Sequence, residues 1–162
     1  MEFFAGGDLG DHLEKLGIFS EQKCKFYTAE IILALQELHK RNIIFRDLKP
    51  ENVLLDCTGH IKLIDFGLSK NNVKFKDKGT KSFCGSVAYV APEMLKKTGH
   101  GKAIDYYAVG ILMYEMLFGM PPFYDDDQEK MFFNIENENI TIPNTVSKEA
   151  QDLLQKLLQK NP

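Results

Sequence analysis

Apolar side chains recur at helical spacing along much of the chain, and the N-terminal half contains two such segments. Ser20 is of a residue type that caps helix N-termini, and the pattern after it predicts a helix extending to about Arg41. Gly17 is placed to end a shorter helix over residues 8–16, because glycine readily adopts the conformation found just after helices. The apolar face of the longer helix is expected to consist of Phe26, Ala29, Ile32, Leu33, Leu35 and Leu38.

The C-terminal half has helical patterns too. Residues 103–118 are apolar on nearly every side, which predicts a helix buried at the centre of a domain. Pro92 can open a short helix over residues 93–96, and residues 127–135 form a modest helical segment. Ser147 can cap a last helix. The apolar stripe of that helix comprises Leu153, Leu154, Leu157 and Leu158.

Short β-prone runs occupy the stretch between the two helical halves. They cover residues 43–45, 53–55 and 61–64, and a turn-like sequence at 56–59 joins the last two into a predicted hairpin. Residues 67–86 are polar with weak periodicity, which predicts a long loop of the kind that is usually functional. With no internal repeat or linker, the sequence predicts one compact, mainly α unit of the α+β class.

Composition narrows the class of protein. The chain has 162 residues, a formal net charge of −3, and 44% hydrophobic and 27% charged residues, which is ordinary for a globular domain. Mild acidity argues against nucleic-acid binding, and the most membrane-like segment, residues 106–118, is too short to span a bilayer. The cysteines are too widely spaced for a disulfide framework or a zinc site, so we expect a reducing, cytoplasmic location. They are Cys24, Cys57 and Cys84.

A cluster of polar residues, RDLKPEN at 46–52, stands between two apolar runs. Taken alone, such a cluster is as readily a solvated turn as a functional site. Two further motifs follow in order: Asp65-Phe66-Gly67 directly after the predicted hairpin, and Ala91-Pro92-Glu93 after the long loop. Three motifs in this order, with hairpin and loop between them, form a specific catalytic signature.

On these motifs the whole chain resembles the large, C-terminal lobe of eukaryotic protein kinases, and within them the AGC group of Ser/Thr kinases. FRDLKPEN is similar to the catalytic loop, IKLIDFG to the metal-binding strand and turn, and SFCGSVAYVAPE to the end of the activation segment. DYYAVGILMYEM with GMPPF resembles the central helix and the following turn, and MEFFAGGDL resembles the hinge. The resemblance implies a helical bundle whose short β-hairpins carry the catalytic loop. It also implies transfer of the ATP γ-phosphoryl group to protein Ser or Thr hydroxyls.

The resemblance assigns roles within the polar cluster. It implies that Asp47 orients the substrate hydroxyl and accepts its proton, while Lys49 points toward the transferring phosphoryl group. Asn52 and Asp65 match the Mg²⁺ ligands, and their hard oxygen atoms suit that ion. Ser86 keeps a hydroxyl that could bond Asp47 or Lys49. ATP is the implied nucleotide, and the matching nucleotide-binding positions are Glu2, Phe4, Asp8 and Leu54.

The resemblance also implies regulation by phosphorylation. Ser82 stands where AGC-like kinases carry an activation-loop phosphate, which requires an upstream kinase, and Thr80 is the alternative site. Arg46 and Lys70 match the phosphate-binding positions, so a phosphate on Ser82 is expected to order the loop against them. The competing interpretation is an ordinary serine in a long loop.

Three acidic residues suggest protein substrates with basic residues near the target. Asp8, Glu51 and Glu115 match positions at which basophilic AGC kinases hold arginines that precede the phosphorylated residue. Glu115 is the most informative, because an acid on a mostly apolar helix is costly unless it has a partner. The alternative is that Glu115 pairs within the chain. Val87 and Ala88 stand where the group usually has Pro-Glu, which alters the peptide-docking surface.

The resemblance begins at the hinge, so we expect residues 1–162 to be a partial kinase domain: hinge and large lobe, without the small lobe and the C-terminal end. The small lobe of the family covers the nucleotide, so the chain alone is expected to be inactive. The alternative function is a non-catalytic peptide-binding or decoy module. Phe45 stands where the family has His or Tyr, and it is expected to pack against Phe66.

Overall fold

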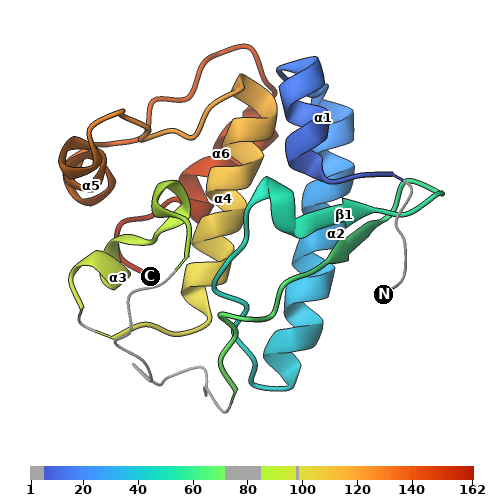
Figure 1. Ribbon diagram of the computed structural model, residues 1–162. Helices are drawn as coiled ribbons and strands as arrows, with labels where there is room; N and C mark the ends of the chain where they lie inside the picture. The colour runs from blue at the N-terminus through green and yellow to red at the C-terminus, as the bar shows by residue number, and fades with distance from the viewer. Residues whose placement is uncertain (1–5, 72–84, 98) are drawn as a thin grey trace.

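The computed structural model describes residues 6–71, 85–97 and 99–162. Helices dominate this part of the chain, and one small antiparallel sheet lies beside them, so the predicted fold class is confirmed. The central helix α4 packs against α2 and α6 (Figure 1). The helices are α1 (Leu9–Leu16), α2 (Glu21–Lys40), η1 (Pro50–Asn52), η2 (Val87–Tyr89), α3 (Pro92–Leu95), α4 (Ala103–Phe118), α5 (Gln128–Asn137) and α6 (Lys148–Leu157), and the strands are β1 (Val53–Leu55) and β2 (Ile61–Leu63).

Helix α2 begins and ends close to where the sequence predicts, but only part of the predicted apolar face is buried: Leu35 is inaccessible, and Ile32 and Leu38 are half-buried against the core. The Ser20 hydroxyl accepts a hydrogen bond from Lys23 N, which is the expected cap. Phe26 and Leu33, predicted to be buried, are 44% and 65% exposed. Apolar and small side chains surround much of this helix, so the stripe that contacts α4 is selected by packing rather than by periodicity. The residues that α2 buries are Cys24, Tyr27, Thr28, Ile31, Leu35 and His39.

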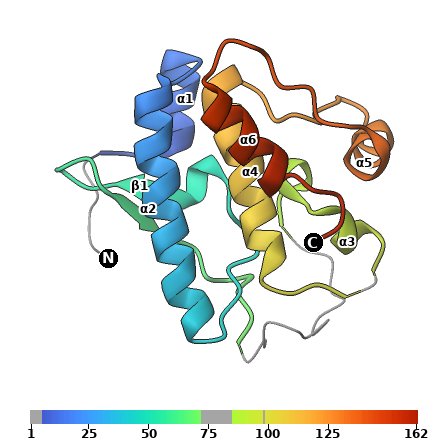
Figure 2. The same cartoon turned by 180° about the vertical axis from the view of Figure 1, so that it is seen from behind.

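Helix α4 is the buried centre of the molecule, as predicted. Seen from behind, α2, α4 and α6 lie next to one another (Figure 2). A β-carbon at Gly110 would lie 2.8 Å from Leu158 Cδ2 and 2.9 Å from Leu157 Cβ, so only glycine permits this approach of α6. The helix ends at Gly119, which has a φ of +88°.

The predicted hairpin is confirmed by β1 and β2, which pair antiparallel with Val53 opposite Leu63. Glu30 of α2 fixes the hairpin to the helix, because its carboxylate accepts a hydrogen bond from Ile61 N at 3.0 Å and pairs with His60. The third predicted strand, residues 43–45, is wrong: Ile44 forms only an isolated bridge with Lys70.

The predicted C-terminal helices are also present. Asp127 caps α5 by accepting a hydrogen bond from Glu129 N, and Ser147 caps α6 through Ala150 N. The predicted stripe on α6 is only partly buried, since Leu154 is inaccessible whereas Leu153 is 37% exposed. Within the described ranges, none of the helices has the length and apolar character that crossing a bilayer requires.

Candidate active site

The polar loop at residues 45–52 is anchored by a carboxylate from the central helix. Asp105 of α4 is 1% exposed, and its two oxygens accept hydrogen bonds from Phe45 N and Arg46 N, each at 2.9 Å. His39 Nε2 of α2 lies 2.7 Å from Asp105 Oδ2. Two buried helices therefore position the backbone at the start of the loop. Our sequence reasoning missed both residues, although an acid on an apolar helix was the signal that singled out Glu115.

Two residues at this site adopt strained backbone conformations. Arg46 has a φ of +70° and Asp65 a φ of +62°, in the left-handed region that costs a non-glycine residue about 1–2 kcal/mol. Arg46 is held there by its backbone bond to Asp105 and by a 2.6 Å bond from its Nε to Leu68 O. Strain beside both Asp47 and the Asp-Phe-Gly turn is typical of functional sites.

Asp47 is held in place by two neighbours from the same loop. The side-chain amide Nδ2 of Asn52 donates to the Asp47 backbone oxygen at 2.8 Å and to Asp47 Oδ2 at 3.0 Å. Lys49 Nζ lies 3.9 Å from Asp47 Oδ2. Asp47 is only 8% exposed, so its carboxylate is fixed in orientation. The structure therefore brings together three of the four residues predicted to act at the phosphoryl group.

The fourth residue, Asp65, is tied to the loop through the backbone. Ile64 N donates to Asn52 O at 3.0 Å, which holds the segment after β2 beside Asn52. Asp65 itself is exposed, and its Oδ1 accepts a hydrogen bond from Gly67 N at 3.0 Å. Because the Asn52 amide nitrogen is used by Asp47, its oxygen Oδ1 is the atom that can ligate a cation. An amide oxygen and a carboxylate fit the hard-ligand preference of Mg²⁺.

This pair does not form a complete metal cage. Within the described residues there is no group of three or more His, Cys, Asp or Glu side chains that could hold a metal ion. Mg²⁺ usually keeps several waters or phosphate oxygens in its shell, so two protein ligands are compatible with a metal that arrives with a nucleotide.

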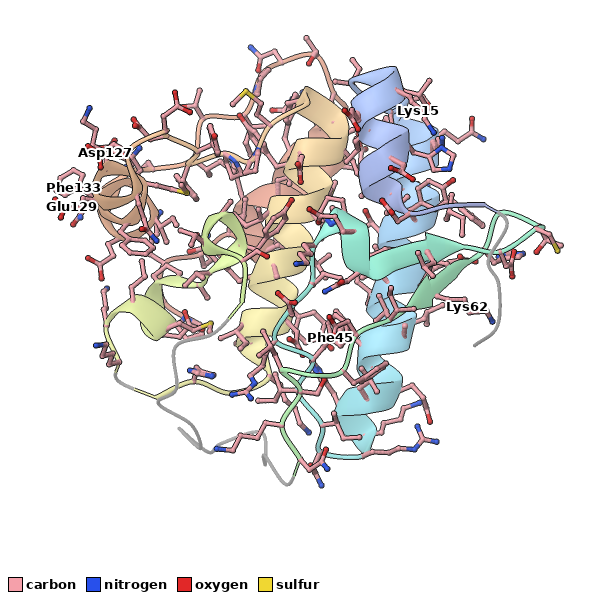
Figure 3. The ribbon with its side chains drawn as sticks, in the orientation of Figure 1. Lys15, Phe45, Lys62, Asp127, Glu129 and Phe133 are labelled. Atoms are coloured by element: carbon pink, nitrogen blue, oxygen red, sulfur yellow. The ribbon has the colours of Figure 1, made fainter. Side chains whose placement is uncertain are left out.

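The predicted contact between Phe45 and Phe66 is confirmed. Their ring centroids are 5.3 Å apart at an interplanar angle of 77°, an edge-to-face arrangement. Phe45 is fully buried in the middle of the molecule beside α4 (Figure 3). Phe66 is 49% exposed, so the aromatic contact ends at an apolar surface next to Asp65.

The predicted nucleotide-binding positions are placed in part. Asp8 and Leu54 form an isolated bridge, and Leu55 N donates to Gly7 O at 2.8 Å, so residues 7–8 pair with β1. The Asp8 carboxylate caps α1 by accepting from Asp11 N at 2.9 Å. The other two positions, Glu2 and Phe4, lie outside the described residues.

The acidic residues predicted to bind substrate line one cleft of about 470 Å³ between α1, η1 and the end of α4. We call this the acidic cleft. Its acidic lining residues are Asp8, Asp11, Glu14, Glu51 and Glu115. Sequence reasoning identified three of them and missed Asp11 and Glu14, which a helical spacing of three residues places on one face of α1.

Glu115 has an internal partner, but a neutral one. The Tyr89 hydroxyl donates to Glu115 Oε2. Burial raises the pKa of the Glu115 carboxyl, the Tyr89 hydrogen bond opposes that rise, and the negative charge of Glu51 adds to it. The intrachain partner that we considered as an alternative therefore exists, and among the described residues it brings no opposite charge to Glu115.

Ser86 does not make the contact predicted for it. Among the described residues its hydroxyl makes no hydrogen bond to Asp47 or Lys49. Ser86 and the neighbouring Gly85 both line a small cavity beside Asp47. A β-carbon at Gly85 would lie 2.9 Å from Arg46 O, and the φ of +100° there also requires glycine.

The predicted phosphate-binding pair can be placed, whereas the predicted phosphorylation sites Ser82 and Thr80 lie outside the described residues. Lys70 pairs through its backbone with Ile44, two residues before Arg46. His100 is 3% exposed. Its pKa is lowered to about 4, mainly by burial and to a smaller extent by the positive charges of Arg46 and Lys70. Both cations therefore act on one buried imidazole, which sequence reasoning did not find.

Known proteins are similar in sequence to this chain across all or nearly all of its length. The family model "Protein kinase domain" matches residues 1–162. Ribosomal protein S6 kinase beta of Caenorhabditis elegans is 47% identical over 99% of the chain, and Serine/threonine-protein kinase YPK1 of Saccharomyces cerevisiae is 49% identical over 100%. The cAMP-dependent protein kinase catalytic subunit of Dictyostelium discoideum is 50% identical over 97%.

These relatives are much longer proteins. The chain spans 29%, 24% and 24% of their respective lengths. The matched part contains the polar loop, the Asp-Phe-Gly turn and the acidic cleft together.

Proposed function

Because the chain belongs to the protein kinase family, we propose that it supplies the catalytic large lobe of a Ser/Thr kinase. The reaction is transfer of the ATP γ-phosphoryl group to a Ser or Thr hydroxyl of a protein. One observation carries the proposal: the Asp47 carboxylate is fixed by Asn52 at 3.0 Å, on a loop whose backbone is anchored by Asp105. Phosphoryl transfer depends on such positioning more than on covalent chemistry.

Asp47 and Lys49 act on the reacting atoms. The substrate hydroxyl oxygen forms a bond to the γ-phosphorus while the bond from that phosphorus to the ADP oxygen breaks. Asp47 orients the hydroxyl and takes its proton, and the ammonium group of Lys49 stabilises the negative charge on the transferring group. Lys49 Nζ lies 3.9 Å from Asp47 Oδ2, so the two groups are close enough to contact the same reacting centre from one side of the loop.

Asn52 and Asp65 would hold Mg²⁺ through the Asn52 amide oxygen and the Asp65 carboxylate. The ion supplies charge neutralisation for the nucleotide phosphates. The chain's own contribution is to fix both donors, by the Asn52–Asp47 hydrogen bonds and by the left-handed backbone of Asp65. Leu54 and Asp8, with Glu2 and Phe4, would contact the rest of the nucleotide.

Regulation is proposed to act through the cationic pair. A phosphate added to Ser82 by an upstream kinase would bind Arg46 and Lys70, and the neighbouring His100 would respond to the neutralised charge. Replacing Ser82 with Ala in the full-length protein should reduce activity. Unchanged activity would remove Ser82 from the proposal and leave Thr80 as the candidate.

Substrate preference is proposed to come from the acidic cleft. Glu51 and Glu115 would each pair with an arginine upstream of the target residue, with Asp8 at the edge of the same cleft. The raised pKa of Glu115 supports this, because a desolvated carboxylate beside a second negative charge is stabilised by an incoming cation.

The test is phosphoryl transfer by the full-length protein that contains these residues. We expect transfer from Mg-ATP to a serine peptide with two upstream arginines, and a loss of roughly 10²–10⁴-fold in Asp47→Asn. Asp152→Asn is the matched control, since Asp152 is an exposed acid on α6 whose ion-pair partner among the described residues is Lys156. Peptide binding without transfer in the unmutated full-length protein would support the alternative function, a non-catalytic module. The isolated 162-residue chain should bind the peptide without transferring phosphate.

A further inference from the structure

The side chain of Lys160, which follows α6, holds the end of α5. Its Nζ donates to Ile135 O at 2.6 Å and to Asn134 O at 3.3 Å, both in the last part of α5. The last four carbonyl groups of a helix have no partner within the helix, and a lysine amine is a suitable donor to them. Both ribbon views place α5 at the edge of the molecule, away from α2 (Figures 1 and 2). Lys160 therefore helps to attach a peripheral helix.

The same amine lies over an aromatic ring. Lys160 Nζ is 3.7 Å from the centroid of the Phe123 ring, and Phe123 is 5% exposed. The face of an aromatic ring attracts a charged amine. Lys160 therefore joins three parts of the chain: the segment after α6, the end of α5 and the connection between α4 and α5.

The surroundings of this amine favour loss of its proton. Burial lowers the pKa of Lys160 to about 8, the negative charge of Glu138 opposes this change, and the positive charge of Lys96 adds to it. A neutral amine has two N–H donors and one lone pair. The two α5 carbonyls can accept both donors, which leaves the lone pair for an electrophile. A desolvated lysine of this kind is a nucleophile near neutral pH.

A cavity of about 220 Å³ adjoins Lys160. A water molecule occupies about 30 Å³ of liquid volume, so the cavity has room for a short acyl group. Three lining residues carry side-chain amides, and amide N–H groups can stabilise the oxyanion that forms during acyl transfer. The residues that line the cavity with Lys160 are Asn139, Ile140, Gln155, Leu158 and Gln159.

We propose that Lys160 is an acylation site, modified by an activated carboxylic acid of the acyl thioester or acyl phosphate class. The neutral Nζ attacks the carbonyl carbon and forms an amide bond. The bond from that carbon to sulfur, or to the phosphate oxygen, breaks, the leaving group takes the electron pair, and the nitrogen releases a proton to solvent. The inference goes beyond the proposed function, because it requires neither a nucleotide nor a peptide.

Acylation should loosen the end of α5. The amide product has one N–H and no charge, so it can donate to only one of the two carbonyls and loses its electrostatic attraction to the Phe123 ring. Helix α5 also packs against α3, which contains Glu93 of the Ala-Pro-Glu motif. We therefore expect faster amide hydrogen exchange in the last turn of α5 after acylation, and the same change in Lys160→Gln.

The experiment uses the full-length protein without nucleotide. Acetyl phosphate and acetyl-coenzyme A are applied in separate arms, and mass spectrometry follows the acetylation of each lysine as the pH is raised. Lys148 is the reference, because it is an exposed lysine at the start of α6. About a quarter of an amine with a pKa near 8 is neutral at pH 7.5, whereas an ordinary lysine is almost fully charged. Lys160 should therefore react at least about ten-fold faster than Lys148 at pH 7.5, and this ratio should fall as the pH rises.

Reaction in either arm supports the site and identifies the class of donor. Reaction of Lys160 in neither arm, or at the rate of Lys148, overturns the proposal. The effect on α5 is read from hydrogen exchange of the unmutated protein before and after acetylation, so it does not depend on a variant that folds. Lys160→Arg is the matched variant, because it keeps the charge and cannot be acylated, and its α5 should be unaffected by either reagent. Equal exchange of α5 in acetylated and untreated protein would overturn the loosening of that helix.

Discussion

The polar loop at 45–52 and the acidic cleft adjoin each other, yet the charged groups of the two regions have different kinds of partner. In the loop, Asp47 is bonded by Asn52 and approached by Lys49, and the preceding backbone is bonded by Asp105. In the cleft, the carboxylates of Glu51 and Glu115 repel each other, and the partner of Glu115 is a neutral tyrosine.

The difference separates positioning from recognition. The groups proposed to act on the phosphoryl group are fixed before any ligand arrives, as catalysis by pre-organised groups requires. The groups proposed to recognise the substrate carry an electrostatic cost that a cationic ligand would relieve. Changes in the loop should therefore affect stability and turnover, whereas changes in the cleft should affect binding.

The largest effect is expected from Asp105→Ala. The substitution removes the carboxylate that accepts from Phe45 N and Arg46 N, and it removes the negative charge beside His39, all in a buried site. Loss of a buried, hydrogen-bonded charge typically costs about 3–5 kcal/mol of unfolding free energy. Urea denaturation measures the loss, with Asp152→Ala on the surface of α6 as the control. Equal stability of the two variants would show that Asp105 does not anchor the loop.

A smaller effect is expected from acidification, through His100. Burial and the charges of Arg46 and Lys70 lower its pKa to about 4, so folding favours the neutral imidazole. The stabilisation is fully present above pH 6.5, the ordinary value for histidine, and is lost progressively as the pH falls toward 4, by up to about 3 kcal/mol. Unfolding free energies of the unmutated protein and of His100→Gln are compared across that pH range, and their difference gives the pH-dependent contribution of His100 to stability. Parallel pH profiles would contradict the assignment.

The cleft provides the next prediction, a pH dependence of peptide binding. Burial raises the pKa of Glu115, and a bound arginine favours its ionised form, so affinity for an arginine peptide should increase as the pH rises through that pKa. A charge-assisted hydrogen bond of this kind contributes about 1.5–3 kcal/mol. In Glu115→Gln the affinity should be lower and the pH dependence weaker, measured as Kd at several pH values between 5 and 8. A variant with the same pH profile as the unmutated protein would exclude Glu115 from binding.

The smallest effect is expected at the outer edge of the cleft. Glu14 is exposed on α1, so solvent and salt screen its interaction with a bound cation. Glu14→Gln should weaken arginine-peptide binding by only about two- to five-fold, as for surface ion pairs. The difference should shrink further at high ionic strength. An effect as large as that of Glu115→Gln would mean that the outer acids, and not the half-buried ones, carry recognition.

Local signals explain which elements of the fold could be predicted. The caps at Ser20 and Ser147, the stop at Gly17 and the hairpin turn after β1 depend on residues close in sequence. The burial of Leu33 could not be predicted correctly, because periodicity does not say which of two adjacent apolar stripes meets a neighbouring helix. A short β-prone run such as 43–45 likewise becomes a strand only if a partner pairs along it.

The residues of the candidate site also divide into those that local sequence signals reveal and those that depend on distant contacts. Asp47, Lys49, Asn52 and Asp65 lie in compact motifs that the sequence displays directly. Asp105 was missed because its bonds go to backbone amides about sixty positions away, where no spacing rule applies. Asp11 and Glu14 were missed because they become part of the cleft only when α1 packs beside Glu51.

The most direct test is a steady-state comparison of Asp47→Asn and Glu115→Gln in the full-length protein. Initial rates of phosphoryl transfer from saturating Mg-ATP are measured against the concentration of a serine peptide with two upstream arginines. The account predicts that Asp47→Asn lowers kcat by roughly 10²–10⁴-fold with little change in KM, whereas Glu115→Gln raises KM with little change in kcat. A normal kcat in Asp47→Asn, or the same pattern of change in both variants, would contradict it.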